Sequence, residues 1–145
     1  MKLKIIIVLA AVLNSVGVLA KAPDVCMPRA TDICEIADGI VAEMHKNIPM
    51  KVSQNVSMTS AFSVNKTVNL VVDLSYNEAY LVNILKKNNG SMKQVKTVME
   101  TNTRNFICSS ELTGAFVGLG GEVTYIYKYN NGMKFMEIDI KNCNE

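Results

Sequence analysis

The sequence predicts an α+β domain: an antiparallel sheet of about four strands, formed by two hairpins and flanked by about four helices, with disulfides as staples. Segments with large residues at every second position alternate along the chain with segments whose apolar residues recur every three or four positions. Asn131-Gly132 separates the last two strand-like segments and is typical of a tight hairpin. The chain also has four cysteines, an even number that fits a disulfide-bonded exported domain.

Residues 1–20 have the features of a secretory signal peptide. Two lysines precede an apolar run from Ile5 to Leu13, and small residues precede the cleavage point expected after Ala20. The run is too short for a membrane span, and no second long apolar run follows. We therefore expect residues 21–145 to be a single α+β domain that is periplasmic or secreted and has no membrane span.

The expected mature chain has a balanced charge. Without Lys2 and Lys4 the basic residues number 13, against 13 acidic residues. A chain without a basic field gives no reason to expect nucleic acid or an anionic membrane as its partner.

The strongest strand signal is the hairpin formed by Val123–Tyr129 and Met133–Lys141. A two-residue type I′ turn at Asn131-Gly132 would place Asn130 opposite Met133. Three further pairs would follow from this register: Tyr127–Met136, Tyr125–Ile138 and Val123–Ile140. One face would then be apolar and the other mostly polar, and a slip of one residue would expose the apolar set.

The remaining elements are predicted from apolar periodicity and from capping residues. In order they are a helix over 29–47, strands over 50–63 and 67–76, and helices over 78–87, 91–106 and 110–119. Asn77 and Ser91 are the expected N-caps of two of these helices, and Pro49 ends the first helix.

All four cysteines lie in the expected mature chain, where an oxidising compartment would pair them. Of the three connectivities we favour Cys26–Cys34 and Cys108–Cys143, because each pair bounds one local unit. The second bond would close a loop of about 35 residues and contribute about 3–4 kcal/mol. We expect no metal site, since the sequence has no Cys-x-x-Cys motif and only one histidine.

No motif in the sequence predicts catalysis. His45 lies near a helix end, where a cation suits the helix dipole. The glycine-rich segment 118–121 lies between a helix and a strand, which is the reverse of the order in a phosphate-binding loop. We therefore expect neither an enzyme nor a cofactor.

Apolar and aromatic residues near the hairpin tip are the candidate partner-binding residues: Ile126, Tyr127, Tyr129 and Phe135. Exposed aromatic side chains are common anchors of protein interfaces. This patch requires one sheet face to be uncovered; the alternative is a sheet covered by helices on both faces.

The order of motifs resembles that of type II secretion pilotins of the α/β type. The residues that carry the resemblance are Phe-Ile-Cys-Ser-Ser at 106–110, Gly-Gly-Glu-Val-Thr-Tyr-Ile-Tyr at 120–127, Asn131-Gly132 and the last cysteine. The resemblance implies one sheet flanked by helices, and a disulfide between Cys108 and Cys143. Pilotins of this type are generally lipoproteins that ferry a secretin subunit to the outer membrane. This chain differs in having no lipobox and in having the extra pair Cys26 and Cys34.

We therefore expect an exported protein-binding domain with a pilotin-like or chaperone-like role in envelope assembly or secretion. Its partner would be another envelope or secreted protein, bound in a groove between helix and sheet or at the hairpin edge. A secreted enzyme inhibitor or immunity-type protein is the alternative, with loops at 61–66 or 88–91 as its candidates. A small hydrolase would need a pocket that gathers His45 with carboxylates.

Overall fold

The structure is a computed structural model that describes residues 33–144, and these form four helices and a five-stranded sheet. The helices are α1 (Ile33–His45), α2 (Glu78–Lys87), α3 (Met92–Ser109) and α4 (Glu111–Gly118). The strands are β1 (Met50–Ser53), β2 (Val56–Val64), β3 (Thr67–Leu74), β4 (Glu122–Lys128) and β5 (Lys134–Ile140). The predicted α+β class is confirmed.

The sheet has the order β1-β2-β3-β4-β5, and its pairing is mixed. Three neighbouring pairs are antiparallel, but β3 and β4 are parallel. The fully antiparallel arrangement expected from two hairpins is therefore wrong at this one pair. Parallel neighbours need a long crossover, and here α2, α3 and α4 supply it.

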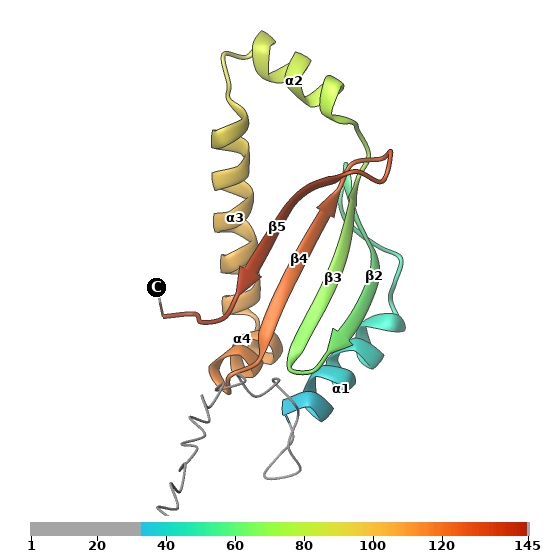
Figure 1. Cartoon of the computed structure of the whole chain (residues 1–145), viewed down its shortest axis with the longest axis vertical. Coiled ribbons are helices and arrows are strands. Elements are labelled where there is room, and N and C mark those ends of the chain that lie inside the picture. The colour runs from blue at the N-terminus through green and yellow to red at the C-terminus, as the bar shows by residue number, and fades with distance from the viewer. Residues whose placement is uncertain (1–32, 145) are drawn as a thin grey trace, which may run out of the picture.

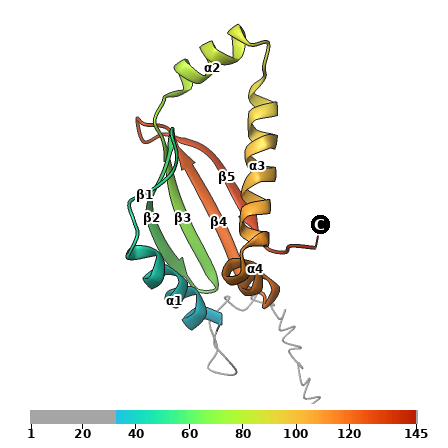
Figure 2. The ribbon, with the colours of Figure 1, turned by 180° about the vertical axis from the view of Figure 1, so that it is seen from behind.

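Helices cover one face of the sheet only (Figures 1 and 2). On this helix face α1 packs against β2 and β3, α3 packs near β5, and α4 packs against α3 and β4. The other α-helix, α2, extends beyond the end of the sheet and leads from β3 to α3 (Figure 1). No element of the described residues covers the second face, which we call the open face.

The core lies between the helices and the central strands. Alternate residues of β3, from Val68 to Leu74, are buried on the helix face, and their neighbours in β4 include Val123 and Tyr125. The apolar stripe predicted for the first helix also faces the core, because Ala37, Ile40 and Val41 of α1 are buried against these strands. The apolar residues at every second position of the strands and at every third or fourth position of the helix thus pack together in one layer.

Most of the predicted hairpin register is confirmed. The pairs Val123–Ile140, Tyr125–Ile138 and Tyr127–Met136 are present as expected.

The turn of this hairpin differs from the prediction. Gly132 has φ +81° and donates its N–H to the Tyr129 carbonyl (2.9 Å), while Tyr129 N–H donates to the Met133 carbonyl (2.9 Å). The loop therefore has three residues with glycine at its left-handed position, and Asn130 does not face Met133. A register shift follows, because Lys128 pairs with Lys134 and Phe135 is left without a partner in β4.

The predicted strand 50–63 is two strands. A turn at 54–55 separates β1 from β2, and β1 forms the edge of the sheet. Asn55 lies in this turn, and its carbonyl accepts the Ser75 N–H (3.0 Å). The turn was missed because its residues, Gln54 and Asn55, carry no glycine or proline signal.

The Cys108–Cys143 disulfide is present and ties the end of α3 to the segment after β5. Arg104 strengthens the same junction by donating from Nη1 to the Asn142 carbonyl (2.9 Å). Cys34 is also disulfide-bonded, whereas the prediction for Cys26 lies outside the described residues, as does the signal peptide. Across residues 33–144, no helix combines the length and apolar character needed to span a membrane.

Candidate functional site

An apolar groove lies on the helix face between α3 and the edge strand β1. We call it the α3–β1 groove; its volume is about 510 Å³. It is lined by Met50, Lys51, Val52, Met58, Asn102, Thr103, Phe106, Tyr125 and Tyr127. The helices that cover the rest of this face leave the surface between α3 and β1 uncovered.

The walls of the groove expose large apolar side chains. Met50 and Val52 of β1 are 39% and 52% exposed, and Phe106 of α3 is 58% exposed. Val98, two turns earlier on α3, is also 56% exposed. Contiguous apolar surface of this kind on a small domain is typical of an interaction site.

Two tyrosines form the floor of the groove and contact each other. The rings of Tyr125 and Tyr127 stack with centroids 5.8 Å apart. The Tyr127 hydroxyl and the Thr103 hydroxyl share a hydrogen bond of 2.8 Å, which joins β4 to α3. This bond therefore links the helical wall of the groove to its floor.

The floor is electrically neutral at ordinary pH. Burial raises the pKa of the Tyr125 phenol well above its usual value, and the neighbouring Tyr127 raises it further. Burial also raises the pKa of Tyr127, although its hydrogen bond with Thr103 acts in the opposite direction. Lys51 is the one charged residue among those that line the groove.

The predicted hairpin-tip patch does not form one exposed surface. Tyr129 and Phe135 are only 4% and 7% exposed, and Tyr127 is also buried. Tyr127 and Tyr129 are buried because they continue the alternate positions of β4 that face the helices. Phe135 joins them because the three-residue turn leaves it unpaired and directs its ring toward the helix face, where it meets Tyr129 (centroids 5.1 Å apart) and Nζ of Lys96 on α3 (5.5 Å).

The fourth residue of that patch, Ile126, is half-buried on the open face, opposite Glu137. Of the four predicted residues only Tyr127 lines the groove, and it does so from the floor.

Sequence reasoning predicted a groove between helix and sheet but not the residues that line it. Met50, Val52 and Phe106 come from segments that are far apart in the chain and meet only in the folded domain. Periodicity could not have found Phe106, because it lies close in helical phase to Val95 and Met99, on the side of α3 that the sequence predicts to face the core.

His45 has a structural position at the end of α1. Its Nε2 donates to the Ala61 carbonyl of β2 (2.8 Å), which ties the helix to the sheet. Within residues 33–144, no carboxylate forms an ion pair with His45, and no group of three potential ligands could hold a metal ion. His45 does not line the α3–β1 groove.

The loops considered for an inhibitor are short turns. Residues 61–64 belong to β2, and only Asn65 and Lys66 connect it to β3. The segment 88–91 is a tight connection between α2 and α3, in which Ser91 is the N-cap of α3. Both segments are thus short connections, and residues 88–91 are exposed to solvent.

Comparison at the level of sequence gives no relatives. No protein-family model and no curated protein match the chain.

Comparison of the fold, by contrast, finds similar solved structures. EpsS, the pilotin of the Vibrio vulnificus type 2 secretion system, has a TM-score of 0.60 at 8% identity over 78% of this chain and 93% of its own. AspS, the type II secretion system pilotin of Vibrio cholerae, has a TM-score of 0.57 at 11% identity over 77% of this chain and 89% of its own.

A Pseudomonas aeruginosa protein described as secreted has a TM-score of 0.59 at 7% identity over 74% of this chain and 88% of its own. The chain thus resembles type II secretion pilotins in fold, and identities this low show a likeness of fold alone.

Proposed function

We propose that this chain is an exported, non-enzymatic, pilotin-like protein that binds a helical segment of an envelope protein in the α3–β1 groove. The observation that carries the proposal is the exposure of Met50, Val52 and Phe106 around a neutral aromatic floor. The fold likeness to two pilotins supports the same role. The secretin subunit implied by that resemblance is the first candidate partner.

The chemistry of the groove favours an apolar protein segment over a polar ligand. Burying the three exposed wall residues removes apolar area from water at about 25 cal/mol per Å², which is the main source of affinity in such interfaces. A rigid floor lowers the cost of ordering the site when the partner binds.

A helix fits this site better than an added strand. The edge strand at this groove is β1, which has only four residues. Its pairing with β2 is irregular between Lys51 and Ser53, and Pro49 comes directly before it. Short length, an irregular register, lysine and proline are the features by which edge strands resist pairing with another chain. The groove offers instead exposed apolar side chains on both of its sides, which suit the apolar stripe of an amphipathic helix.

Co-purification tests the proposal. The disulfide-intact protein is used as bait for envelope extract of the source organism, and the eluate is probed for the secretin subunit. Phe106→Glu places a charge in the groove and should reduce recovery at least tenfold, since burying an unpaired carboxylate is costly. Leu112→Glu is the matched control, because Leu112 is similarly exposed on α4 and does not line the groove.

Equal recovery with both variants would place the binding surface elsewhere. Recovery of a soluble hydrolase in place of an envelope subunit would favour the inhibitor hypothesis.

A further inference from the structure

A second, polar pocket lies at the end of the sheet away from α4, where three connections meet (Figure 1). Its lining comes from the β1–β2 turn, the β3–α2 segment, the first turn of α2 and the β4–β5 turn: Asn55, Ser75, Tyr76, Asn77, Tyr80 and Asn130. The volume is about 310 Å³, and no residue is shared with the α3–β1 groove. The pocket is therefore a separate candidate binding site.

Two tyrosines form one wall of this pocket. The rings of Tyr76 and Tyr80 lie with their centroids 5.9 Å apart and their planes inclined by 32°. Tyr80 is 57% exposed, whereas Leu81, the next residue of α2, is buried. An exposed ring beside a polar pocket offers a flat apolar face to a ligand.

Each of the three asparagine side chains uses one polar atom of its amide in a hydrogen bond within the protein. The other polar atom of each amide is left to bind a ligand. Asn77 Oδ1 accepts the Tyr80 N–H (2.9 Å), and Asn130 Nδ2 donates to the Ser75 carbonyl (3.2 Å). Asn55 Oδ1 accepts from Ser75 Oγ (3.0 Å). Two donor groups, on Asn55 and Asn77, and one acceptor oxygen, on Asn130, are then left for a ligand.

The backbone keeps these groups together. Asn130 N–H donates to the Tyr76 carbonyl (3.2 Å), and Ser75 N–H donates to the Asn55 carbonyl (3.0 Å). The turn of one hairpin, the turn of the other and the start of α2 are thus tied to one another. Preorganised polar groups of this kind lower the cost of binding a small ligand.

The lining residues contain no charged side chain. A phosphate would require basic groups, and a metal cation would require carboxylates. A flat aromatic face combined with fixed neutral donors and acceptors matches a molecule that has an apolar face and a rim of hydroxyl groups.

We propose that this pocket binds a neutral sugar ring, with the C–H face of the pyranose on Tyr80 and its hydroxyl groups hydrogen-bonded to Asn55, Asn77 and Asn130. Sugar hydroxyls both donate and accept hydrogen bonds, so they match the two donors and one acceptor that the amides offer. The proposal is independent of the protein-binding role of the groove.

An NMR titration of the disulfide-intact protein tests this site. The probes are chitotetraose, a neutral oligomer of N-acetylglucosamine, and maltotetraose, a neutral oligomer of glucose. We expect at least one of them to shift the backbone amide signals of Asn77, Tyr80 and Asn130, while the signals of Phe106 and Val52 stay unchanged. The identity of the active probe would show which sugar the pocket prefers.

Variants give the sharper test. Tyr80→Ala should weaken binding about tenfold because the stacking surface is lost, whereas Tyr80→Phe should retain it. Asn77→Asp keeps the oxygen that caps α2 but removes the donor, so it should weaken binding without loss of folding. Phe106→Ala is the control in the groove and should leave sugar binding unchanged.

Shifts confined to the groove, no shift with either oligosaccharide, or equal affinity of Tyr80→Ala and the unaltered protein would overturn the proposal.

Discussion

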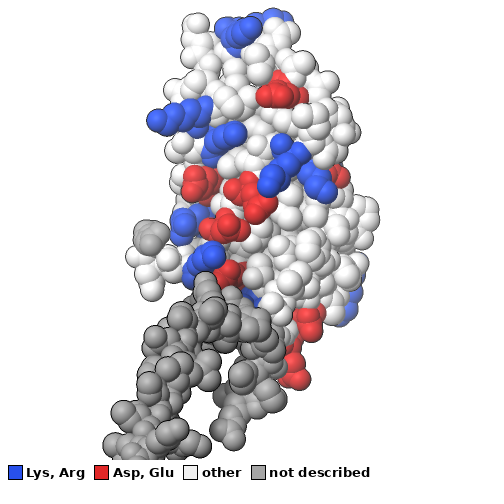
Figure 3. Space-filling model, viewed as in Figure 1, with Lys and Arg blue, Asp and Glu red and all other residues white. Residues whose placement is uncertain are grey.

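The two faces of the sheet are both accessible, and they differ in chemistry. The helix face leaves an apolar groove in which Met50, Val52 and Phe106 meet solvent. The open face carries acidic and basic side chains in close alternation over its β4–β5 side (Figure 3).

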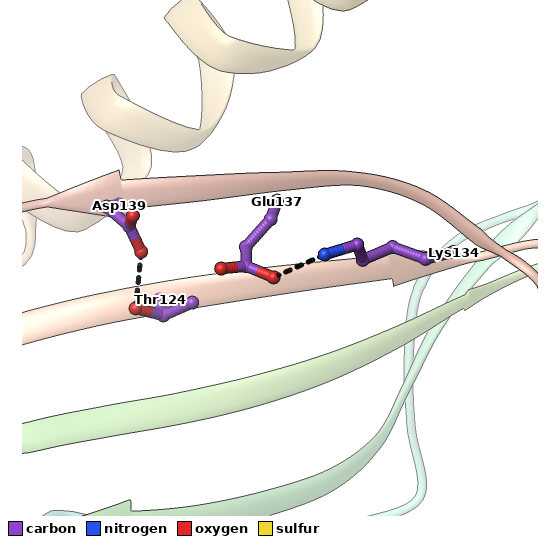
Figure 4. A network of polar contacts seen from close by, with 4 residues as sticks. All are labelled: Thr124, Lys134, Glu137 and Asp139. Carbon is purple, nitrogen blue, oxygen red and sulfur yellow. Dashed lines mark hydrogen bonds and ion pairs between the residues drawn. The ribbon is translucent and has the colours of Figure 1, made fainter.

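The polar groups of the open face pair with one another. Thr124 Oγ1 donates to Asp139 Oδ1 (2.7 Å) between β4 and β5, and Lys134 Nζ pairs with Glu137 Oε2 (3.0 Å) along β5 (Figure 4). At the other end of β4, Glu122 pairs with both Lys66 (3.0 Å) and Lys141 (3.4 Å).

A partner on this face would have to break these pairs or bury them, and both cost free energy. We therefore expect a partner to bind in the groove and the charged part of the open face to remain in contact with solvent.

Removal of the Cys108–Cys143 bond should have the largest effect on the groove side. The double variant Cys108→Ser, Cys143→Ser opens a loop with a sequence separation of 35 residues. We expect the free energy of unfolding to fall by about 3–4 kcal/mol, as measured by urea denaturation. Because the bond holds the end of α3, partner binding should weaken as well. A loss below about 1 kcal/mol would show that the bond contributes little to the stability of this domain.

The hydrogen bond between Thr103 and Tyr127 should have the next largest effect. Thr103→Val leaves the Tyr127 hydroxyl without its partner and should cost about 1–2 kcal/mol of unfolding free energy. Tyr127→Phe, added to that variant, should restore part of the loss, because no buried hydroxyl then remains unpaired. Urea denaturation of both single variants and the double variant completes the cycle. Additive losses would contradict a direct coupling between α3 and β4.

Alkaline pH should lower the free energy of unfolding through Tyr125 in the floor of the groove. The pKa of Tyr125 is raised in the folded state, so the folded protein keeps this proton at a pH where the unfolded chain loses it. The stabilisation by the neutral phenol is fully present below the ordinary tyrosine pKa of 10.0 and is lost as the pH rises above it. Unfolding free energies measured from pH 8 to pH 11 should fall less steeply for Tyr125→Phe. Identical slopes would exclude this residue as a source of alkaline sensitivity.

A substitution on the open face should change the unfolding free energy least. Glu137→Gln removes the ion pair with Lys134, in which both side chains are largely exposed to solvent. We expect a change in unfolding free energy of at most about 0.5 kcal/mol, and less at high salt. Thermal or urea denaturation at two salt concentrations would measure it. A loss above about 1 kcal/mol would mean that the network of the open face is a structural element and not only a solvated surface.

Local patterns were sufficient to predict the helices and the body of the last hairpin. The caps Asn77 and Ser91 act as predicted, and the large residues at alternate positions of β4 fixed its register with β5. These features depend on contacts between residues that are close in the chain. The pairing of β3 with β4 was not predictable in the same way, because α2, α3 and α4 separate these strands.

The candidate site was harder to predict because small local differences redirect side chains. Asn131-Gly132 is compatible with a two-residue and with a three-residue loop, and the longer loop moves Phe135 from the polar face to the helix face. The groove in turn depends on the position of β1 relative to α3, which no periodicity in the sequence encodes.

Site-specific photocrosslinking in the expressing cells tests the central claim most directly. Phe106 in the groove and Phe62 on the open-face side of β2 are both exposed phenylalanines, so the larger side chain of benzoylphenylalanine can extend into solvent at either position. We predict that the probe at position 106 crosslinks to a single envelope protein and that the probe at position 62 does not. Crosslinking to an envelope protein from position 62 alone would contradict the assignment of recognition to the groove.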